Sequence, residues 1–432
     1  PTIAQNPDSF EVLYSAKSFR EQLLSAIKQA THRIYIVALY LEDDGAGREV
    51  LDALMAAKQR NPELDIKVLV DFHRARRGLI GHKDDSGNYD MYRKVNDAAE
   101  HPIEILGVPV KSREFMGVLH LKGFIVDDAV IFSGASLNNI YLHQNEKYRF
   151  DRYHVIESKE LARSMREMIQ TYLVDDVAVS SLTQPKDKEH LPTKTEVSSL
   201  KHRLSKAEYQ YNSTKIGNRV TPIVGLGRKK NKLNKIVVAM VDESEDALFI
   251  CTPYFNPPYI LVRALAKHLR NGKRIDIVVG DKTSNDFYIP PEEEFSTIGA
   301  LPYMYEQSLR KFAKRQQWAI ENGQLNIHLW KDGRNSFHLK GISADSKRHL
   351  ITGSNLNPRA WALDLENGLL IQDDNECWKE KFEQEQQHIL QHTERLSHYS
   401  QIETLHNYPA PVRKIMKRIK RLKADFLLRR IL

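Results

Sequence analysis

The chain has 432 residues, of which 41% are hydrophobic and 28% charged, with a formal net charge of +8. This length and composition predict a large core divided over two or three domains, and exclude a disordered chain and a small disulfide-stapled domain. A membrane-spanning helix needs about 20 apolar residues, whereas the longest run here is eight, at 34–41. We therefore expect no transmembrane segment. The first residues show no signal-peptide pattern, and isolated Cys251 and Cys377 are typical of a reducing cytoplasm.

Along the chain, the predicted strands and helices form two matching series. Each series has an apolar strand, a helix, a strand ending in Asp and a third strand. The first series lies at 34–41, 50–54, 66–71 and 103–106, and the second at 248–255, 261–266, 275–281 and 325–329. This alternation predicts the α/β class, with two pseudo-symmetric domains, each a mixed β-sheet flanked by helices.

The predicted domain boundaries follow from where this pattern stops. Residues 174–235 are rich in Lys, Ser, Thr and Gln, which predicts a linker with one helix near 197–209. The apolar residues of 376–406 predict a long closing helix. The expected divisions are a domain at 1–173, the linker at 174–235, a domain at 236–406 and a tail at 407–432.

Each series ends in nearly the same motif. The first copy reads HLKGFIVD at 120–127 and GASLN at 134–138, and the second reads HLKGISAD at 338–345 and GSNLN at 353–357. Side chains alternate along an extended segment, so His120 and Lys122 project to the same side, as their counterparts in the second copy do. The residues that we expect to act together are His120, Lys122, Asn138, His338, Lys340 and Asn357.

These residue types suit a phosphate ester. If the two halves pack around a pseudo-twofold axis, both sets converge, one imidazole attacks phosphorus and the other handles protons. Ammonium and amide groups stabilise the equatorial oxygens, so that neither a metal nor a cofactor is expected. A single HxK motif is more often structural, but two copies at matched positions of a repeat indicate a site.

The paired motifs resemble the signature of the phospholipase D superfamily, HxK-x4-D-x6-GSxN. The Asn lies one position later than in that signature, and seven rather than six residues separate Asp345 from Gly353. Either Asn355 or Asn357 is therefore the phosphate ligand of the second copy. Four further segments are similar to those of the phospholipase-D-type bacterial phosphatidylserine synthases, and so is the basic tail. The four segments are 70–78, 141–149, 280–290 and 356–361.

The resemblance implies that the chain makes phosphatidylserine and CMP from CDP-diacylglycerol and L-serine through a phosphatidyl-histidine. We take His120 as the first nucleophile and His338 as acid and base, but the two halves are near-equivalent in sequence, so the reverse assignment stays open at this point. Asp151 and Glu366 are expected to orient the histidines, and the motif acids Asp127 and Asp345 to be structural. The expected substrate contacts are Ser136, Asn355, Arg359, His73, Arg74 and Arg77. The basic cluster at 73–77 either meets the pyrophosphate or is a solvated loop.

The tail carries the whole net charge. Nine basic residues and one acidic residue, Asp425, lie in 411–432. Val412, Ile415, Met416 and Ile419 recur at helical spacing, which predicts a basic amphipathic helix. Such a helix either docks reversibly on an anionic membrane or packs on its own protein. The residues expected to contact a membrane are Arg413, Lys414, Lys417, Arg418, Lys420 and Arg421.

Two other functions stay open from the sequence. A hydrolase of the same superfamily would use water or another alcohol as acceptor, and a membrane- or nucleic-acid-binding protein would have no turnover. Matched imidazoles weigh against the binding protein, and no specific nucleic-acid partner is expected, because the body of the chain is electrically neutral. The expected location is the cytoplasm, with reversible association at the inner face of the cytoplasmic membrane.

Overall fold

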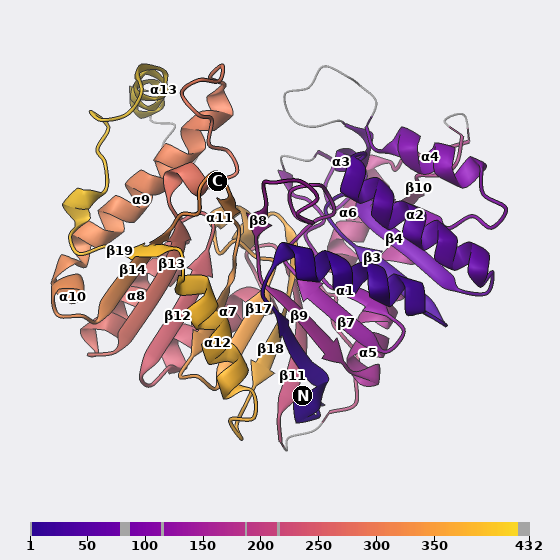
Figure 1. The fold of residues 1–432 in the computed structure, drawn as a ribbon, viewed down its shortest axis with the longest axis horizontal. Coiled ribbons are helices and arrows are strands. Elements are labelled where there is room, and N and C mark those ends of the chain that lie inside the picture. Colours follow the sequence, from indigo (N-terminus) through magenta and orange to yellow (C-terminus); the bar gives the residue numbers. More distant parts are fainter. Residues whose placement is uncertain (1, 78–86, 114–115, 186–187, 214–216, 422–432) are drawn as a thin grey trace. The chain divides into compact units, whose positions relative to one another are not determined.

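The computed structural model describes residues 2–77, 87–113, 116–185, 188–213 and 217–421 (Figure 1). The chain forms two compact units. Unit 1 comprises Pro1–Leu233, Ile351–Gly353 and Leu363–Trp378, and unit 2 comprises Asn234–Leu350, Ser354–Ala362 and Lys379–Leu432. Unit 1 thus includes segments from late in the sequence. The boundaries predicted near 173 and 235 stay a prediction.

Unit 1 is built on an eight-stranded mixed sheet in the order β10-β5-β4-β3-β6-β7-β9-β2. Strands β3, β4 and β5 are parallel, and the other pairs are antiparallel. Its strands are β2 (Phe10–Leu13), β3 (Arg33–Val37), β4 (Asp65–Asp71), β5 (Glu104–Val108), β6 (Phe124–Val126), β7 (Ala129–Ser133), β9 (Tyr153–Glu157) and β10 (Ser180–Ser181). Strands β1 (Ile3–Ala4), β11 (Arg219–Leu226) and β18 (Leu365–Gln372) pair antiparallel in the same unit.

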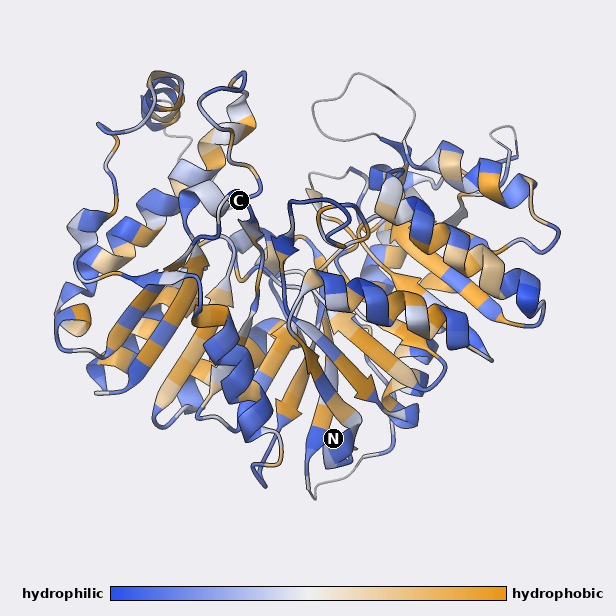
Figure 2. Cartoon of the chain, in the orientation of Figure 1, coloured by the Kyte–Doolittle hydropathy of each residue, from blue (hydrophilic) through white to orange (hydrophobic). Residues whose placement is uncertain are grey.

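Helices α1, α2, α5 and α6 of unit 1 are amphipathic and begin at side-chain caps. Ser15 caps α1, Asp44 caps α2, Ser158 caps α5, and Thr193 forms a capping box with Glu196 on α6. Their apolar residues pack on the sheet, whose strands are mostly orange in Figure 2. The helices are α1 (Ala16–Gln29), α2 (Gly45–Arg60), α3 (Phe72–Arg76), α4 (Tyr89–Asp97), α5 (Lys159–Ile169) and α6 (Lys194–Leu204).

Unit 2 repeats this plan in the strand order β17-β16-β12-β13-β14-β19, with β12, β13 and β14 parallel. The strands are β12 (Ala247–Thr252), β13 (Arg274–Gly280), β14 (Leu325–Trp330), β16 (Gly341–Ala344), β17 (Arg348–Thr352) and β19 (Thr393–Arg395). The helices are α7 (Lys232–Glu243), α8 (Tyr259–Arg270), α9 (Leu301–Arg315), α10 (Gln317–Glu321), α11 (Pro358–Ala362), α12 (Lys379–Leu390) and α13 (Ala410–Arg421). The order β7-β6-β3-β4-β5 therefore matches β17-β16-β12-β13-β14, and the predicted α/β repeat is confirmed.

Two local predictions were wrong. The long helix expected over 376–406 ends at Leu390, and the chain then forms β19. Strand β19 pairs with β14 and satisfies backbone groups that the edge of the sheet would otherwise expose, so pairing overrides the helical pattern. The expected linker also contains β11, an eight-residue strand, and its helix runs over Lys194–Leu204 rather than 197–209.

The acid at the end of each motif ties its hairpin to the first strand of its repeat. Asp127, at φ +50°, accepts hydrogen bonds of 2.8–3.0 Å from Thr31, His32 and Arg33 at the entry to β3. Asp345, at φ +56°, accepts four equivalent bonds from residues 244–247 at the entry to β12. Burial raises the pKa of both carboxyls, but these hydrogen bonds outweigh it and hold both pKa values below the usual range.

We expect Asp127→Asn to lower the free energy of unfolding by about 1–3 kcal/mol at pH 7, because charge-assisted hydrogen bonds are lost while Asn tolerates the positive φ. A depressed folded-state pKa stabilises the fold above the unfolded pKa of about 3.9, and this contribution disappears as the pH falls through the folded value. The difference between wild type and variant should therefore shrink below about pH 4 in urea denaturation. Exposed Asp128, paired with Arg33 at 3.4 Å, provides the control Asp128→Asn. An equal loss of unfolding free energy in the two variants would contradict the structural role of Asp127.

The basic helix α13, labelled in Figure 1, belongs to unit 2, and its residues Val412 and Met416 pack on the rest of that unit. Val412 is fully buried with Tyr303 and Tyr408, and Met416 packs against this cluster. Lys414, Lys417, Arg418, Lys420 and Arg421 are exposed. The basic residues Lys423, Arg429 and Arg430 lie outside the described residues. No helix in the described ranges is long and apolar enough to cross a membrane.

Candidate active site

The first HxK motif lies in an extended segment that pairs with the start of β18. His120 donates its backbone N–H to Leu365, and the N–H of Val118 binds the carboxylate of Asp364 at 3.0 Å. This pairing places Nδ1 of His120 2.9–3.0 Å from both oxygens of Glu366. Both side chains are buried, with exposures of 8% and 1%. A carboxylate at Nδ1 holds the proton on that nitrogen and leaves the lone pair of Nε2 for chemistry.

Lys122 is held by β18 through its backbone. Asn367 accepts from the N–H of Lys122 and donates to its C=O, both at 2.8 Å, and also binds the hydroxyl of Tyr209. The Lys122 side chain lies against Gly353 of the second motif, where an added Cβ would come within 2.5 Å of Cγ. Gly353 is therefore required for the close approach of this lysine.

Two other predicted residues of unit 1, Arg74 and Asn138, both contact Tyr40. Arg74 stacks over the ring of Tyr40 at 4.8 Å and lies 3.5 Å from Glu42. The Tyr40 hydroxyl accepts from the amide of Asn138, whose oxygen caps the turn at Tyr141. Asp71 binds the backbone N–H groups of Arg74 and Leu119, and so fixes the residue before His120.

The cluster at 73–77 therefore does not behave as one solvated loop. His73 binds the carbonyl of Lys111 at 2.8 Å, Arg74 is buried, and Arg77 is exposed. Ser136 and Asp151 are both 2% exposed. The contacts of Arg74 are with protein groups, so its assignment to a substrate stays a prediction.

The second motif occupies the same place in unit 2. His338 and Lys340 are 5% and 1% exposed, and the ammonium of Lys340 contacts Nδ1 of His338. The ring of Tyr254, at the end of β12, meets the imidazole edge-on at 6.2 Å. The side-chain oxygen of Asn357 caps α11, as Asn138 caps its own turn. The two motifs thus share their sequence and the Asn cap, whereas Nδ1 contacts a carboxylate at His120 and an ammonium at His338.

Asn355 and Arg359 flank Asn357. Thr252 donates to the carbonyl of Asn355, whose side-chain oxygen is buried with no hydrogen-bond partner among the described residues. Arg359 is half-buried near Tyr305. The assignment of Asn355 or Asn357 as the phosphate ligand stays a prediction. Across the described parts of the chain, no group of three or more His, Cys, Asp or Glu side chains is arranged to hold a metal ion.

Comparison with known proteins identifies the family of the chain. A family model described as "Cardiolipin synthase, PLD-like domain" matches residues 23–173 and 237–391, which together exceed half of the chain. The chain belongs to the phospholipase-D-like family. Its two family matches coincide with the two sequence repeats, and each contains one HxK motif.

Relatives within the phospholipase-D-like family match the chain over its full length. The CDP-diacylglycerol–serine O-phosphatidyltransferase of Haemophilus influenzae is 46% identical over 442 residues, covering 100% of this chain and 96% of the relative. The enzyme of the same activity from Escherichia coli K12 is 45% identical over 437 residues, with the same coverage. The crystal structure of the Haemophilus influenzae phosphatidylserine synthase superposes with a TM-score of 0.96 at 45% identity, covering 100% of this chain and 97% of that chain.

Sequence reasoning missed two residues of this phospholipase-D-like site. Asn367 holds the backbone of Lys122, and Asp71 holds that of Leu119. Both are buried polar side chains at apolar strands, at 1% and 0% exposure. A polar residue inside an apolar run was the available signal, because such groups are buried only with partners.

Proposed function

We propose that the chain transfers the phosphatidyl group of CDP-diacylglycerol to the hydroxyl of L-serine, forming phosphatidylserine and CMP. The observation that carries this proposal is the buried His120, whose Nδ1 is bound to Glu366 beside Lys122. This is the arrangement that a nucleophilic histidine requires. Full-length similarity to enzymes of this activity supports the choice of substrates.

In the first step, Nε2 of His120 attacks the phosphorus that carries diacylglycerol. The P–N bond forms, the bond to the bridging pyrophosphate oxygen breaks, and CMP leaves with that oxygen. The substituted imidazole carries positive charge, which the carboxylate of Glu366 stabilises at Nδ1. His338 supplies the proton that the departing CMP takes up.

In the second step, the serine hydroxyl attacks the same phosphorus. The new P–O bond forms, the P–N bond breaks, and His338 takes the hydroxyl proton. Two in-line displacements predict retention of configuration at phosphorus. Lys122 and Lys340 stabilise the charge on the equatorial oxygens, with the amides of Asn138 and of Asn355 or Asn357.

The test is release of CMP from CDP-diacylglycerol in mixed micelles, with and without serine. Release that depends on serine and yields phosphatidylserine supports the proposal. Equal release without serine, yielding phosphatidic acid, would show a hydrolase, and absence of release would show a binding protein. Either outcome overturns the proposed transferase.

We also propose that α13 docks the chain on the anionic inner face of the cytoplasmic membrane. Its first turn anchors it to unit 2 through Val412, while its exposed lysines and arginines face solvent. Each basic residue near an anionic leaflet contributes about 1 kcal/mol. The half-buried Ile415 and Ile419 add apolar surface to this helix.

Replacing Lys414, Lys417 and Lys420 together with Gln should weaken sedimentation with vesicles of anionic lipid by about 100-fold, because about 3 kcal/mol of attraction is lost. The matched control replaces three exposed lysines of unit 1 with Gln, namely Lys17, Lys28 and Lys159. Equal weakening by the two triple variants would mean that net charge, rather than α13, drives binding.

A further inference from the structure

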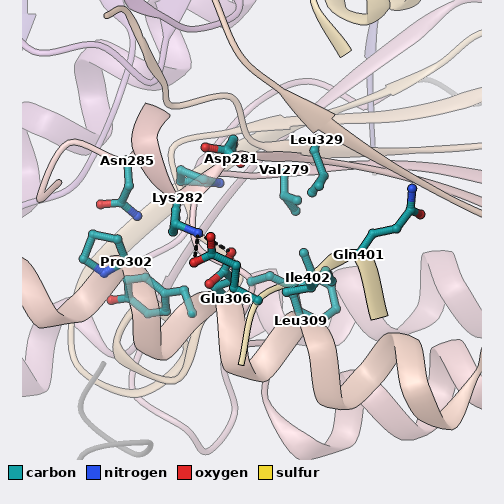
Figure 3. Close-up of a pocket in the computed structure, with 15 residues that line it drawn as sticks. Val279, Asp281, Lys282, Asn285, Pro302, Glu306, Leu309, Leu329, Gln401 and Ile402 are labelled. Atoms are coloured by element: carbon teal, nitrogen blue, oxygen red, sulfur yellow. Dashed lines mark hydrogen bonds and ion pairs between the residues drawn. The ribbon is translucent and has the colours of Figure 1, made fainter. Parts of the chain in front are cut away.

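Unit 2 contains a cavity of about 210 Å³ at the carboxyl ends of β13 and β14 (Figure 3). Part of its wall is the segment 280–290, which the sequence marks as shared with phosphatidylserine synthases and to which the mechanism above gives no role. Gly280, Asp281, Lys282 and Asn285 of this segment line the cavity. Tyr305 and Glu306 of α9 line it as well, and Gln401–Glu403 close another side.

The cavity adjoins the second HxK motif. Gly280 packs on Phe337, the residue before His338, so closely that an added Cβ would lie 3.1 Å from the Phe337 side chain. Tyr254 stacks on the cavity residue Tyr305 at 5.1 Å and meets the His338 ring at 6.2 Å. One aromatic ring therefore spans the distance from the cavity wall to the imidazole that we assign as the base for the acceptor.

The charges of the cavity suit a zwitterion. Lys282 lies 3.1 Å from Glu306 and 2.6 Å from Glu403, and Asp281 adds a third carboxylate. Burial lowers the pKa of Lys282, but these two carboxylates outweigh it, so the amine stays charged. Three acids against one base attract an ammonium group and repel phosphates, while Lys282 provides a partner for a carboxylate.

The size of the cavity favours serine over the cytidine nucleotide as its occupant. A cavity of about 210 Å³ is smaller than the roughly 300–1,000 Å³ that hold drug-sized ligands. A cytidine nucleotide would also bring its phosphates against the carboxylates. A three-carbon amino acid meets neither obstacle.

We propose that this cavity binds the amino-acid acceptor, L-serine, with its ammonium group on Glu306 and Asp281 and its carboxylate on Lys282. The proposal rests on the proposed transferase function and specifies its acceptor site. The serine carboxylate replaces Glu403 at Lys282, since the Glu403 side chain is 46% exposed and moves easily into water. The hydroxymethyl group then faces Tyr305, whose ring contact with Tyr254 connects the cavity to His338.

The test compares two reactions of the full chain on CDP-diacylglycerol micelles. One is serine-dependent release of CMP, and the other is exchange of labelled CMP into CDP-diacylglycerol without serine. The variants are Lys282→Gln, Glu306→Gln and the double variant, in which two amides replace the buried ion pair and only the 46% exposed Glu403 loses a charged partner. We expect the KM for serine to rise about 10- to 100-fold, because charge-assisted hydrogen bonds to serine are lost. The rate of CMP exchange, which needs no serine, should change much less.

Lys267→Gln is the matched control, since Lys267 is exposed on α8 and pairs only loosely, at 3.6 Å, with Asp242. Its ratio of serine transfer to exchange should stay at the wild-type value. Calorimetry with serine alone should show binding to wild type and loss of binding in the double variant, with thermal denaturation confirming that the variant folds. A raised KM for CDP-diacylglycerol with an unchanged KM for serine would overturn the proposal. If CMP release by the wild type does not depend on serine, that result would instead overturn the transferase function itself.

Discussion

Replacing His120 with Asn is expected to abolish phosphatidyl transfer, with kcat lowered about 10³-fold or more. The variant lacks the nitrogen that forms the P–N bond, so no covalent route remains. The free energy of unfolding should fall by about 1–3 kcal/mol at most, because the buried Glu366 loses its hydrogen bond with Nδ1 of His120. Turnover is measured as CMP release, and folding as thermal denaturation.

Intact-mass analysis tests the same histidine directly. Wild type quenched with CDP-diacylglycerol in the absence of serine should gain the mass of one phosphatidyl group, mapped to His120. The His120→Asn variant should gain none. His32→Asn, at an exposed histidine of unit 1, should react like wild type. An adduct mapped to His338 in wild type would reverse the roles of the two histidines.

Glu366→Gln should lower kcat by about 10²- to 10⁴-fold while changing the KM for CDP-diacylglycerol little. The amide oxygen of Gln can accept a hydrogen bond from Nδ1–H but carries no charge to stabilise the substituted imidazole. The amide NH₂ group can instead donate to Nδ1, which selects the tautomer with its proton on Nε2. The Glu366 side chain is 1% exposed, so water cannot replace it.

Glu11→Gln is the matched control for this variant, because Glu11 is an exposed carboxylate on β2 of the same unit. It should retain wild-type kcat and stability. If Glu366→Gln lost activity only in proportion to lost folded protein, Glu366 would be a structural residue. If it kept wild-type kcat, the proposed role of the carboxylate would be wrong.

The predictions that succeeded rest on contacts between near neighbours in sequence. Short apolar runs gave the buried strands, and Gly123 and Gly341, both at positive φ, precede or open matching strands after each HxK. Because the pattern occurs twice, a repeated fold could be predicted from 120–138 and 338–357 alone. The predicted helix over 376–406 failed where a distant partner intervened, since Leu396 binds the backbone of Ile327 in β14.

The sequence alone named the candidate site residues, namely two HxK pairs, their amides and the acid at the end of each motif, and their chemical roles stay a prediction. It also named Glu366 as an orienting acid but not the histidine that it serves. Tertiary structure decided that Glu366 binds His120, 246 positions away, and that Asn367 holds Lys122. Local periodicity determines which side chains share a face, whereas partners so far apart meet only when strand pairing closes the chain between them.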